Sequence, residues 1–230
     1  MRETSAGFVL HRQDYRETSR ILRCYTREHG RVDLLCKGCR SGRKNSLVVE
    51  PFRIYEMSWS GRSELKTLSQ AEEMAVFPVS RSSECLYCGF YINELLSNLT
   101  RSGEADDQIF DLYKDTLSQL SANSDEDIQP ILRRFELSLL QCLGYGIALD
   151  IEQDGITPVQ PDARYGFHFD QGLYRINGNE KYLVHGDTLL ALQQGRYTND
   201  RQVSEARTFM RHIIRYYLSG VTIHSRKLFA

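Results

Sequence analysis

Apolar and polar positions alternate with a short period in the first third of the chain. Five segments there are rich in Val, Ile, Leu, Tyr, Phe and Thr, which is typical of β-strands: Ala6–His11, Arg20–Thr26, Arg31–Lys37, Leu47–Trp59 and Glu64–Glu73. Glu28–Gly30 predicts a tight turn between the second and third, and Pro51 predicts a bend or bulge within the fourth. Five short antiparallel strands in about 75 residues fit a small closed barrel such as the OB-fold.

The period becomes helical after residue 80. Apolar residues three to four apart predict helices over Glu84–Arg101, Asp107–Leu120 and Ile131–Leu143, and Gly144-Tyr-Gly146 predicts the end of the third. The acidic run Ser124–Asp127 favours a helix start. Tyr165–Tyr174 alternates around an Asp-Gln-Gly turn and predicts a lone β-hairpin, followed by helices at about Asp187–Gln194 and Asp200–Leu218.

The whole pattern predicts an α+β chain with two domains. Residues 1–78 would form a five-stranded antiparallel β-barrel of the OB-fold type. Residues 79–230 would form a mainly α-helical domain with a small β insert at about 150–185.

Charge is segregated along the chain although the formal net charge is only −1. Residues 1–78 carry 14 Lys/Arg against 10 Asp/Glu, residues 79–195 carry 8 against 18, and residues 196–230 carry 7 against 2. A basic first domain, an acidic middle and a basic end suggest different partners for different faces. The N-terminus lacks an apolar signal core and no apolar run approaches the length of a membrane helix, so we expect a cytoplasmic protein.

One loop concentrates positive charge. The apolar segment from Val32 to Cys36 runs directly into a Gly- and Ser-rich stretch with four cations and no acid: Lys37, Arg40, Arg43 and Lys44. Such a loop stays solvated and projects its charges outward, which is the arrangement that a phosphate backbone binds. An ordinary solvated loop is the alternative interpretation.

Several motifs together resemble a known family, the bacterial recombination mediator RecO. They are Gly7-Phe-Val-Leu-His11 with Arg16-Glu-Thr-Ser19, Gly30-Arg-Val-Asp-Leu with Lys37-Gly-Cys-Arg40, Glu64-Leu-Lys-Thr-Leu68, Tyr91-Ile-Asn-Glu-Leu95, Arg133-Arg-Phe-Glu136 and Leu143-Gly-Tyr-Gly146. They occur in order at suitable spacings, cover both predicted domains and are clearest to about residue 147.

The resemblance implies an N-terminal OB-fold, a C-terminal helical domain and no catalytic centre. RecO proteins bind single- and double-stranded DNA, anneal complementary strands and, with RecR, help RecA replace the single-strand binding protein SSB in recombinational repair of DNA damage. They also bind the acidic C-terminal tail of SSB. The resemblance therefore implies these partners, RecA indirectly, no membrane and a nucleoid-associated location. Some members carry a four-cysteine zinc site, but the corresponding region here, about 141–175, contains only Cys142.

An OB barrel usually binds nucleic acid across strands 2 and 3, framed by the first and fourth loops. Cations recur at each of these places, and we expect them to bind DNA: Arg12, Arg16, Arg20, Arg31, Lys37, Arg40, Arg43, Lys44, Arg62 and Lys66. Four aromatic residues are candidates for base stacking, with core packing the favoured interpretation of each alone: Tyr15, Tyr25, Tyr55 and Trp59. If roughly four to six phosphates are neutralised, the log–log salt slope on single strands is about −3 to −4.

Two features of the helical domain suggest further contacts. Arg207, Arg211 and Arg215 share one helix face, which either extends the DNA surface or is simply solvated. On the wheel of 131–143, Arg133 lies beside Leu137 and Leu140, and this set suits an acidic peptide that ends in an aromatic residue and a carboxylate. In the family that ligand is the SSB tail. Glu136 falls within the apolar arc, so we expect a buried acid paired with an arginine.

Six cysteines include two CxxC pairs, Cys36/Cys39 and Cys85/Cys88. A zinc site is disfavoured because the intervening stretch is long and because Cys85 and Cys88 share a helix face with core residues. The sequence has no Walker loop, dinucleotide fingerprint, HExxH or Gly-x-Ser-x-Gly motif, so we expect no enzyme, no cofactor and no metal. Two alternatives stay open: an OB-fold RNA-binding module, and a zinc-dependent protein that uses the cysteines.

Overall fold

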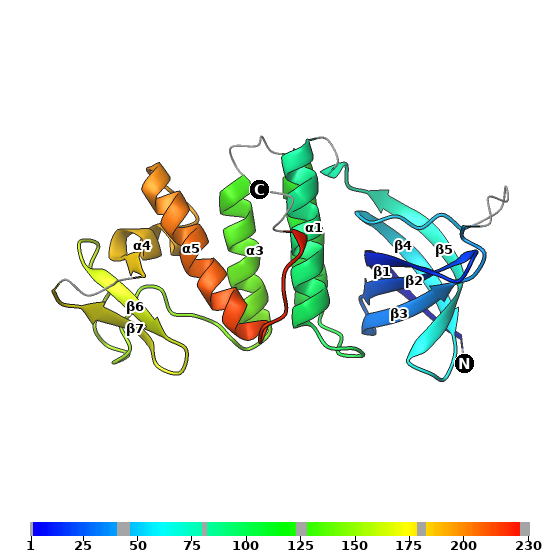
Figure 1. Ribbon diagram of the computed structural model, residues 1–230, viewed down its shortest axis with the longest axis horizontal. Coiled ribbons are helices and arrows are strands. Elements are labelled where there is room, and N and C mark those ends of the chain that lie inside the picture. Colours follow the sequence, from blue (N-terminus) through cyan, green and yellow to red (C-terminus); the bar gives the residue numbers. More distant parts are fainter. Residues whose placement is uncertain (1, 41–46, 80–81, 123–127, 179–182, 226–230) are drawn as a thin grey trace. The chain divides into compact units, whose positions relative to one another are not determined.

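A computed structural model describes residues 2–40, 47–79, 82–122, 128–178 and 183–225 (Figure 1). The chain divides into two compact units, one of residues 1–122 with 223–230 and the other of residues 123–222. The expected boundary near residue 78 lies at the end of the barrel. The two helices that follow the barrel nevertheless pack with it and belong to the first unit.

The first unit contains a closed barrel of five strands: β1 (Arg2–Tyr15), β2 (Ser19–Thr26), β3 (Gly30–Cys36), β4 (Arg53–Ser60) and β5 (Leu65–Val76). The strand order around the barrel is β1-β2-β3-β5-β4, and only the β3–β5 pair is parallel. This is the topology of the OB-fold, so the predicted fold class is confirmed. Buried and partly exposed residues alternate strictly along β3, as a strand with one face in the core requires.

The predicted fourth strand begins later than its apolar pattern indicated. Residues 47–52 form no strand, and β4 starts at Arg53. Phe52 has a φ of +62°, which is rare for a bulky residue, and it follows Pro51. The bend that Pro51 predicted is therefore confirmed, but it precedes the strand and does not interrupt it.

Two helices complete the first unit: α1 (Ser83–Leu99) and α2 (Asp107–Ala122). The Ser82 hydroxyl accepts from the Cys85 amide (3.1 Å) and so caps α1. The chain returns to this unit at its end, where the Glu94 carboxylate on α1 accepts from the amides of His224 (2.6 Å) and Ser225 (2.8 Å). In Figure 1 this red segment runs beside α1.

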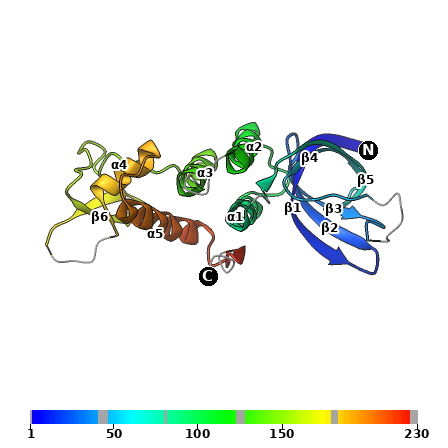
Figure 2. The same cartoon turned by 90° about the horizontal axis from the view of Figure 1, so that it is seen from above.

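The second unit contains α3 (Ile128–Cys142), α4 (Gly186–Gln194) and α5 (Asp200–Tyr217) together with a small sheet. The predicted hairpin is confirmed as β6 (Arg164–His168) and β7 (Gly172–Ile176), and a short third strand, β8 (Val184–His185), pairs with β6. Figure 2 shows α4 and α5 beside this sheet. The expected acidic helix start at 124–127 lies outside the described residues.

Candidate nucleic-acid interface

Four cations gather where the β1–β2 turn meets the loop after β3. The Arg40 amide donates to the Thr18 carbonyl (2.9 Å) and fastens the loop to the turn. Asp14 then holds two guanidinium groups, because its carboxylate accepts from Arg20 (3.0 Å) and lies 3.2 Å from Arg40. We call this group the basic rim: Arg16, Arg20, Lys37 and Arg40.

The basic rim keeps a surplus of positive charge. The hydrogen bond from Asp14 raises the pKa of Arg20, so this guanidinium stays charged throughout the physiological range. Arg16, at a φ of +54°, stands over the Tyr15 ring with 5.2 Å between guanidinium carbon and ring centroid. Among the described residues, neither Arg16 nor Lys37 lies in an ion pair, and Glu17 is the other acid of the turn. Exposed, unneutralised cations are what a phosphate backbone requires.

Arg31 takes a position that differs from the expected DNA contact. Its side chain is half-buried, and Nη1 donates to the Ser97 carbonyl at the end of α1 (2.6 Å). Burial lowers the pKa of Arg31, and the neighbouring Arg23 adds to this effect. A cation at the carbonyl end of a helix stabilises that end. Arg31 therefore joins α1 to the barrel, and its predicted contact with DNA stays a prediction.

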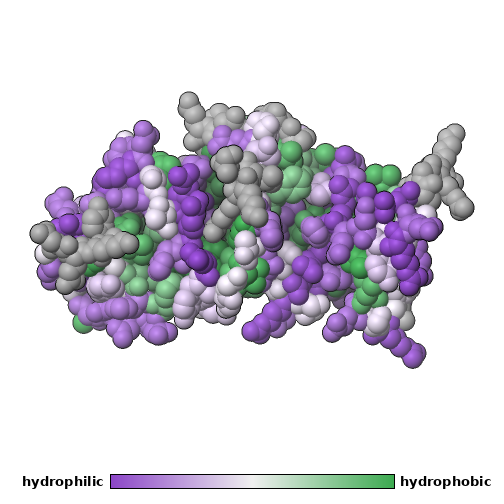
Figure 3. All heavy atoms as spheres, viewed as in Figure 1, coloured by the Kyte–Doolittle hydropathy of each residue, from purple (hydrophilic) through white to green (hydrophobic). Residues whose placement is uncertain are grey.

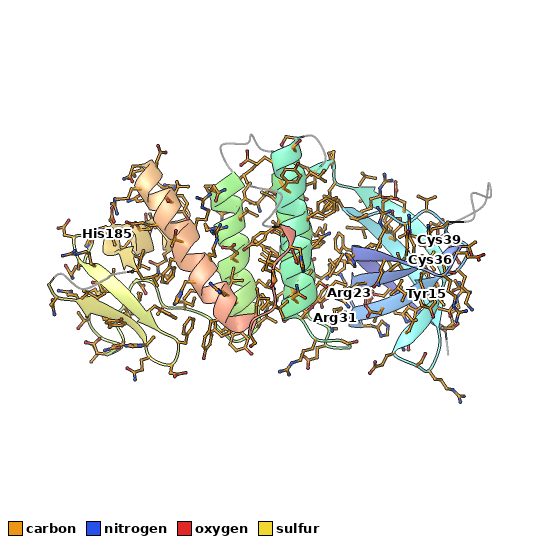
Figure 4. All side chains as sticks on the ribbon, in the orientation of Figure 1. Tyr15, Arg23, Arg31, Cys36, Cys39 and His185 are labelled. Atoms are coloured by element: carbon orange, nitrogen blue, oxygen red, sulfur yellow. The ribbon has the colours of Figure 1, made fainter. Side chains whose placement is uncertain are left out.

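α1 also contacts part of the barrel face that nucleic acid usually occupies. Arg23 on β2 and Asp33 on β3 are cross-strand partners, and the Arg23 Nε atom lies 3.3 Å from Asp33 Oδ1. Arg23 Nη1 also donates to the Ser97 hydroxyl (3.1 Å). Figure 4 shows Arg23 and Arg31 toward α1, whereas Tyr15, Cys36 and Cys39 lie away from it. The cross-strand pair Ile21 and Leu35 stays partly exposed at the basic-rim end of the same two strands. The open part of the face therefore adjoins the basic rim.

The other predicted cations lie apart from the basic rim or are engaged with acids. Arg12 pairs with Glu50, and Lys66 lies 3.5 Å from Glu3. Lys66 is level with Leu34 in the middle of β3, so it does not reach the exit of that strand. Arg62, in the loop before β5, is exposed. Arg43 and Lys44 lie outside the described residues.

Three of the four candidate stacking residues are buried. Tyr55 and Trp59 belong to the barrel core, whereas Tyr25 lies outside that core and its hydroxyl donates to the Asp106 carbonyl (3.4 Å). Tyr25, Tyr55 and Trp59 are all at most 3 % exposed, so the core-packing interpretation is confirmed for them. The Trp59 indole donates to the Glu3 carboxylate, and the Glu50 amide donates to the Tyr55 hydroxyl (2.9 Å). Tyr15 is partly exposed beside the basic rim and is the one of the four that can meet a base. On the face shown in Figure 3, hydrophilic side chains (purple) cover much of the barrel.

The expected peptide site on α3 needs a correction. Arg133 and Leu140 are buried, and the Arg133 side chain lies 2.9 Å from the Glu136 carboxylate. The predicted buried acid is thus confirmed, and its partner is the very arginine that was assigned to the peptide. A buried carboxylate is costly without a cation, which explains why Arg133 is buried beside it. Leu137 remains partly exposed.

The neighbouring residue Arg134 lines a pocket of about 300 Å³ in the second unit. This pocket is formed by one face of α3, by the segment after it and by the end of α4: Arg134, Leu137, Ser138, Gln141, Ile147–Asp150 and Leu192–Gly195. Residues 134, 137, 138 and 141 follow the i, i+3, i+4, i+7 spacing of a single helix face. That spacing can be read from the sequence, and it places Arg134 on the same helix face as Leu137.

All six cysteines lie in the described residues, and none of them forms a disulfide. Cys85 and Cys88 are buried on α1, as their shared helix face predicted. Burial raises the pKa of the Cys36 thiol to about 12, with Cys39 adding to the effect, which disfavours the thiolate form that metals and redox partners need. Within the described ranges, no group of three or more His, Cys, Asp or Glu side chains is placed to hold a metal ion.

Comparison with known proteins finds two family models that match successive parts of the chain. The family model described as Recombination protein O N terminal matches residues 1–77, and the one described as Recombination protein O C terminal matches residues 81–227. The chain belongs to the RecO family. The DNA repair protein RecO of Methylococcus capsulatus is 40% identical over 224 residues, covering 97% of this chain and 91% of the relative. That of Dechloromonas aromatica is 36% identical over 231 residues, covering 99% and 95%.

Membership of the RecO family gives the basic rim its context, because the N-terminal family model spans the whole barrel. The C-terminal model likewise spans the pocket at Arg134. In the described part of the chain, no helix is both long and apolar enough to cross a membrane.

Proposed function

We propose that this protein binds single- and double-stranded DNA at the barrel and anneals complementary single strands in recombinational repair. The observation that carries the proposal is the basic rim, where four cations surround one end of an OB barrel in a RecO family member. The named relatives are DNA repair proteins, which supports a DNA ligand over RNA.

Binding at the basic rim would be independent of sequence. Arginine and lysine side chains neutralise phosphates and release condensed counterions, and they read no base edges. Tyr15, Ile21 and Leu35 offer the bases partly exposed aromatic and apolar contacts beside these charges. A strand held by its phosphates keeps its bases free to pair, which is the condition that annealing needs.

A second part of the proposal concerns protein partners. We propose that the acidic C-terminal tail of SSB docks at the Arg134 pocket, where the guanidinium takes the terminal carboxylate and Leu137 contacts the aromatic ring. Asp150 at the same pocket would repel the tail's other acids, so the ring and the terminal carboxylate would carry the affinity. With RecR, the protein would then help to load RecA onto SSB-coated DNA in the nucleoid. We propose no catalytic step.

Annealing of complementary strands precoated with SSB tests both parts. We expect the protein to accelerate annealing, and we expect the acceleration to disappear when the SSB tail is deleted. Annealing of bare strands only would retain the DNA part and refute the tail site. No annealing in either case, together with tighter binding to structured RNA, would favour the RNA-binding alternative.

A further inference from the structure

A group of aromatic side chains lies at the surface of the second unit, at the C-terminal end of α5. The Phe169 ring, from the β6–β7 turn, stacks on Tyr216 with centroids 3.6 Å apart and planes 9° apart. Tyr145 stacks on Tyr217, with centroids 4.4 Å apart and planes 27° apart. We call these four residues the aromatic platform: Tyr145, Phe169, Tyr216 and Tyr217.

The aromatic platform is unlike the core of this unit because its rings reach solvent. Tyr216 is 50 % exposed although it stacks on Phe169 and meets Tyr217 edge to face, and Tyr145 is 43 % exposed although it stacks on Tyr217. Stacking on one face leaves the other face of a planar ring free for a further planar group. Two such rings on one surface are more than solubility or packing needs, and aromatic rings are enriched where proteins bind ligands.

A pocket of about 340 Å³ opens beside these rings. Phe167, Phe169 and Tyr217 supply its aromatic lining, and the β6–β7 turn supplies polar groups from Asp170 and Gln171. Aromatic walls with a few polar groups can receive a nucleobase, which presents two flat apolar faces and a polar edge.

Positive charge approaches the aromatic platform along α5. Arg207, Arg211 and Arg215 are all exposed and recur every four residues, so they form one row along α5, and Tyr216 follows Arg215 in the sequence. Within the described residues, Arg207 and Arg215 belong to no ion pair, which leaves their charge available. His212 also lies against the platform, with its ring centroid 5.3 Å from that of Phe169.

We propose that the aromatic platform and this arginine row form a second binding site for single-stranded DNA, separate from the basic rim. Bases stack on the open faces of Tyr216 and Tyr145, one base enters the adjoining pocket, and the phosphates follow the arginines of α5. The inference rests on the proposed function, which it deepens. A protein with one strand site on each unit can hold two complementary strands at once, as annealing requires.

The test measures binding of fluorescently labelled oligothymidylate to the full-length protein with the charges of Lys37 and Arg40 reversed, so that binding at the platform is observed. This protein is compared with and without Tyr216→Ala. Losing one stacked base weakens binding by roughly 5- to 150-fold. The salt slope stays unchanged, because stacking releases no counterions. Tyr216→Phe keeps the ring and binds like the protein with Tyr216. Tyr174→Ala is the matched control, since it removes a stacked tyrosine of the same unit that is not part of the platform.

An abasic oligonucleotide of the same length separates stacking from charge. The proteins with and without Tyr216→Ala bind it equally if the inference holds, whereas an equal loss on both oligonucleotides would refute stacking. Arg215→Glu provides a second variant that keeps the ring, and it makes the salt slope shallower. An affinity for oligothymidylate that Tyr216→Ala leaves unchanged overturns the inference, and a loss of RecR binding alone would assign the surface to a protein partner.

These outcomes are distinct from failure of the proposed function. Charge reversal at Lys37 and Arg40 removes the basic rim and leaves the aromatic platform intact. If the charge-reversed protein binds DNA as the wild type does and Tyr216→Ala then weakens that binding, the barrel site fails and the platform stands. If charge reversal weakens DNA binding and Tyr216→Ala changes nothing further, the barrel site stands and the platform fails.

Discussion

Replacing Arg133 with alanine should destabilise the second unit and should have no selective effect on peptide binding. The Arg133 side chain is 7% exposed, the Glu136 side chain is fully buried, and 2.9 Å separates their charged atoms. At an effective dielectric constant of about 20, two unit charges at that distance attract by roughly 6 kcal/mol. Desolvation of both groups offsets most of that attraction, so the intact pair contributes little net stability.

Removing only Arg133 is more costly than replacing the whole pair, because the Glu136 carboxylate then stays buried without this cation. Breaking a buried pair in this way costs about 3–5 kcal/mol. For a unit of about 100 residues, that cost lowers the melting temperature by at least about 12 °C. Arg134 is the matched control, since it is adjacent in sequence and exposed, and its replacement by alanine should change the free energy of unfolding by less than about 0.5 kcal/mol.

Urea unfolding of the full-length variants, followed by far-UV circular dichroism, measures these differences. The double variant Arg133→Leu with Glu136→Leu should recover most of the loss, because well-packed apolar residues replace a buried pair at little cost. The reasoning is refuted if Arg133→Ala unfolds within about 0.5 kcal/mol of the wild type. It is also refuted if the double variant is less stable than the single one.

Three further predictions follow from other parts of the molecule. The hydrogen bond from Trp59 is the main cause that lowers the pKa of Glu3. Its contribution to the stability of the folded protein is present above about pH 4.5 and is lost as the pH falls through the lowered pKa. Fluorescence emission from this single tryptophan should therefore change in that range before circular dichroism does, and Glu3→Gln should abolish the change. Gly30→Ala should lower the free energy of unfolding in urea more than Gly38→Ala does. Both glycines have φ near +60–70°, but a Cβ at Gly30 would lie 2.0 Å from a carbonyl oxygen, whereas a Cβ at Gly38 would meet open space. Equal losses of about 1–2 kcal/mol for the two variants would contradict this expectation. Arg134→Ala should weaken binding of the SSB tail peptide about tenfold or more without changing DNA affinity, as calorimetry can show, and unchanged peptide affinity would rule out the pocket.

Much of the fold was predictable because the hydrophobic period is strong where one face of each element is buried. The strict alternation along β3 and the helical stripe of α5 are examples, and both elements end within one residue of their predicted limits. The segment Leu47–Phe52 was misread because Leu47 and Val49 pack against the barrel core from an irregular conformation, which periodicity does not distinguish from a strand. β8 has two residues, too few to show any period.

The candidate site was predictable in composition but not in geometry. The sequence places cations at the loops of an OB barrel, yet it does not show that α1 covers part of the β2–β3 face and engages Arg31. The burial of Arg133 has a similar origin, since two adjacent arginines look alike until the burial of Glu136 is known. The aromatic platform depends on the contact between Phe169 and Tyr216, which are far apart in sequence.

The salt dependence of single-stranded DNA binding tests the central claim most directly. We predict that the logarithm of the binding constant falls with the logarithm of salt concentration with a slope of about −3 to −4 for the wild type. Reversing the charges of Lys37 and Arg40 together should make that slope shallower by roughly 1.4, which corresponds to two phosphate contacts. A wild-type slope near zero, or a slope unchanged by this double reversal, would contradict binding at the basic rim.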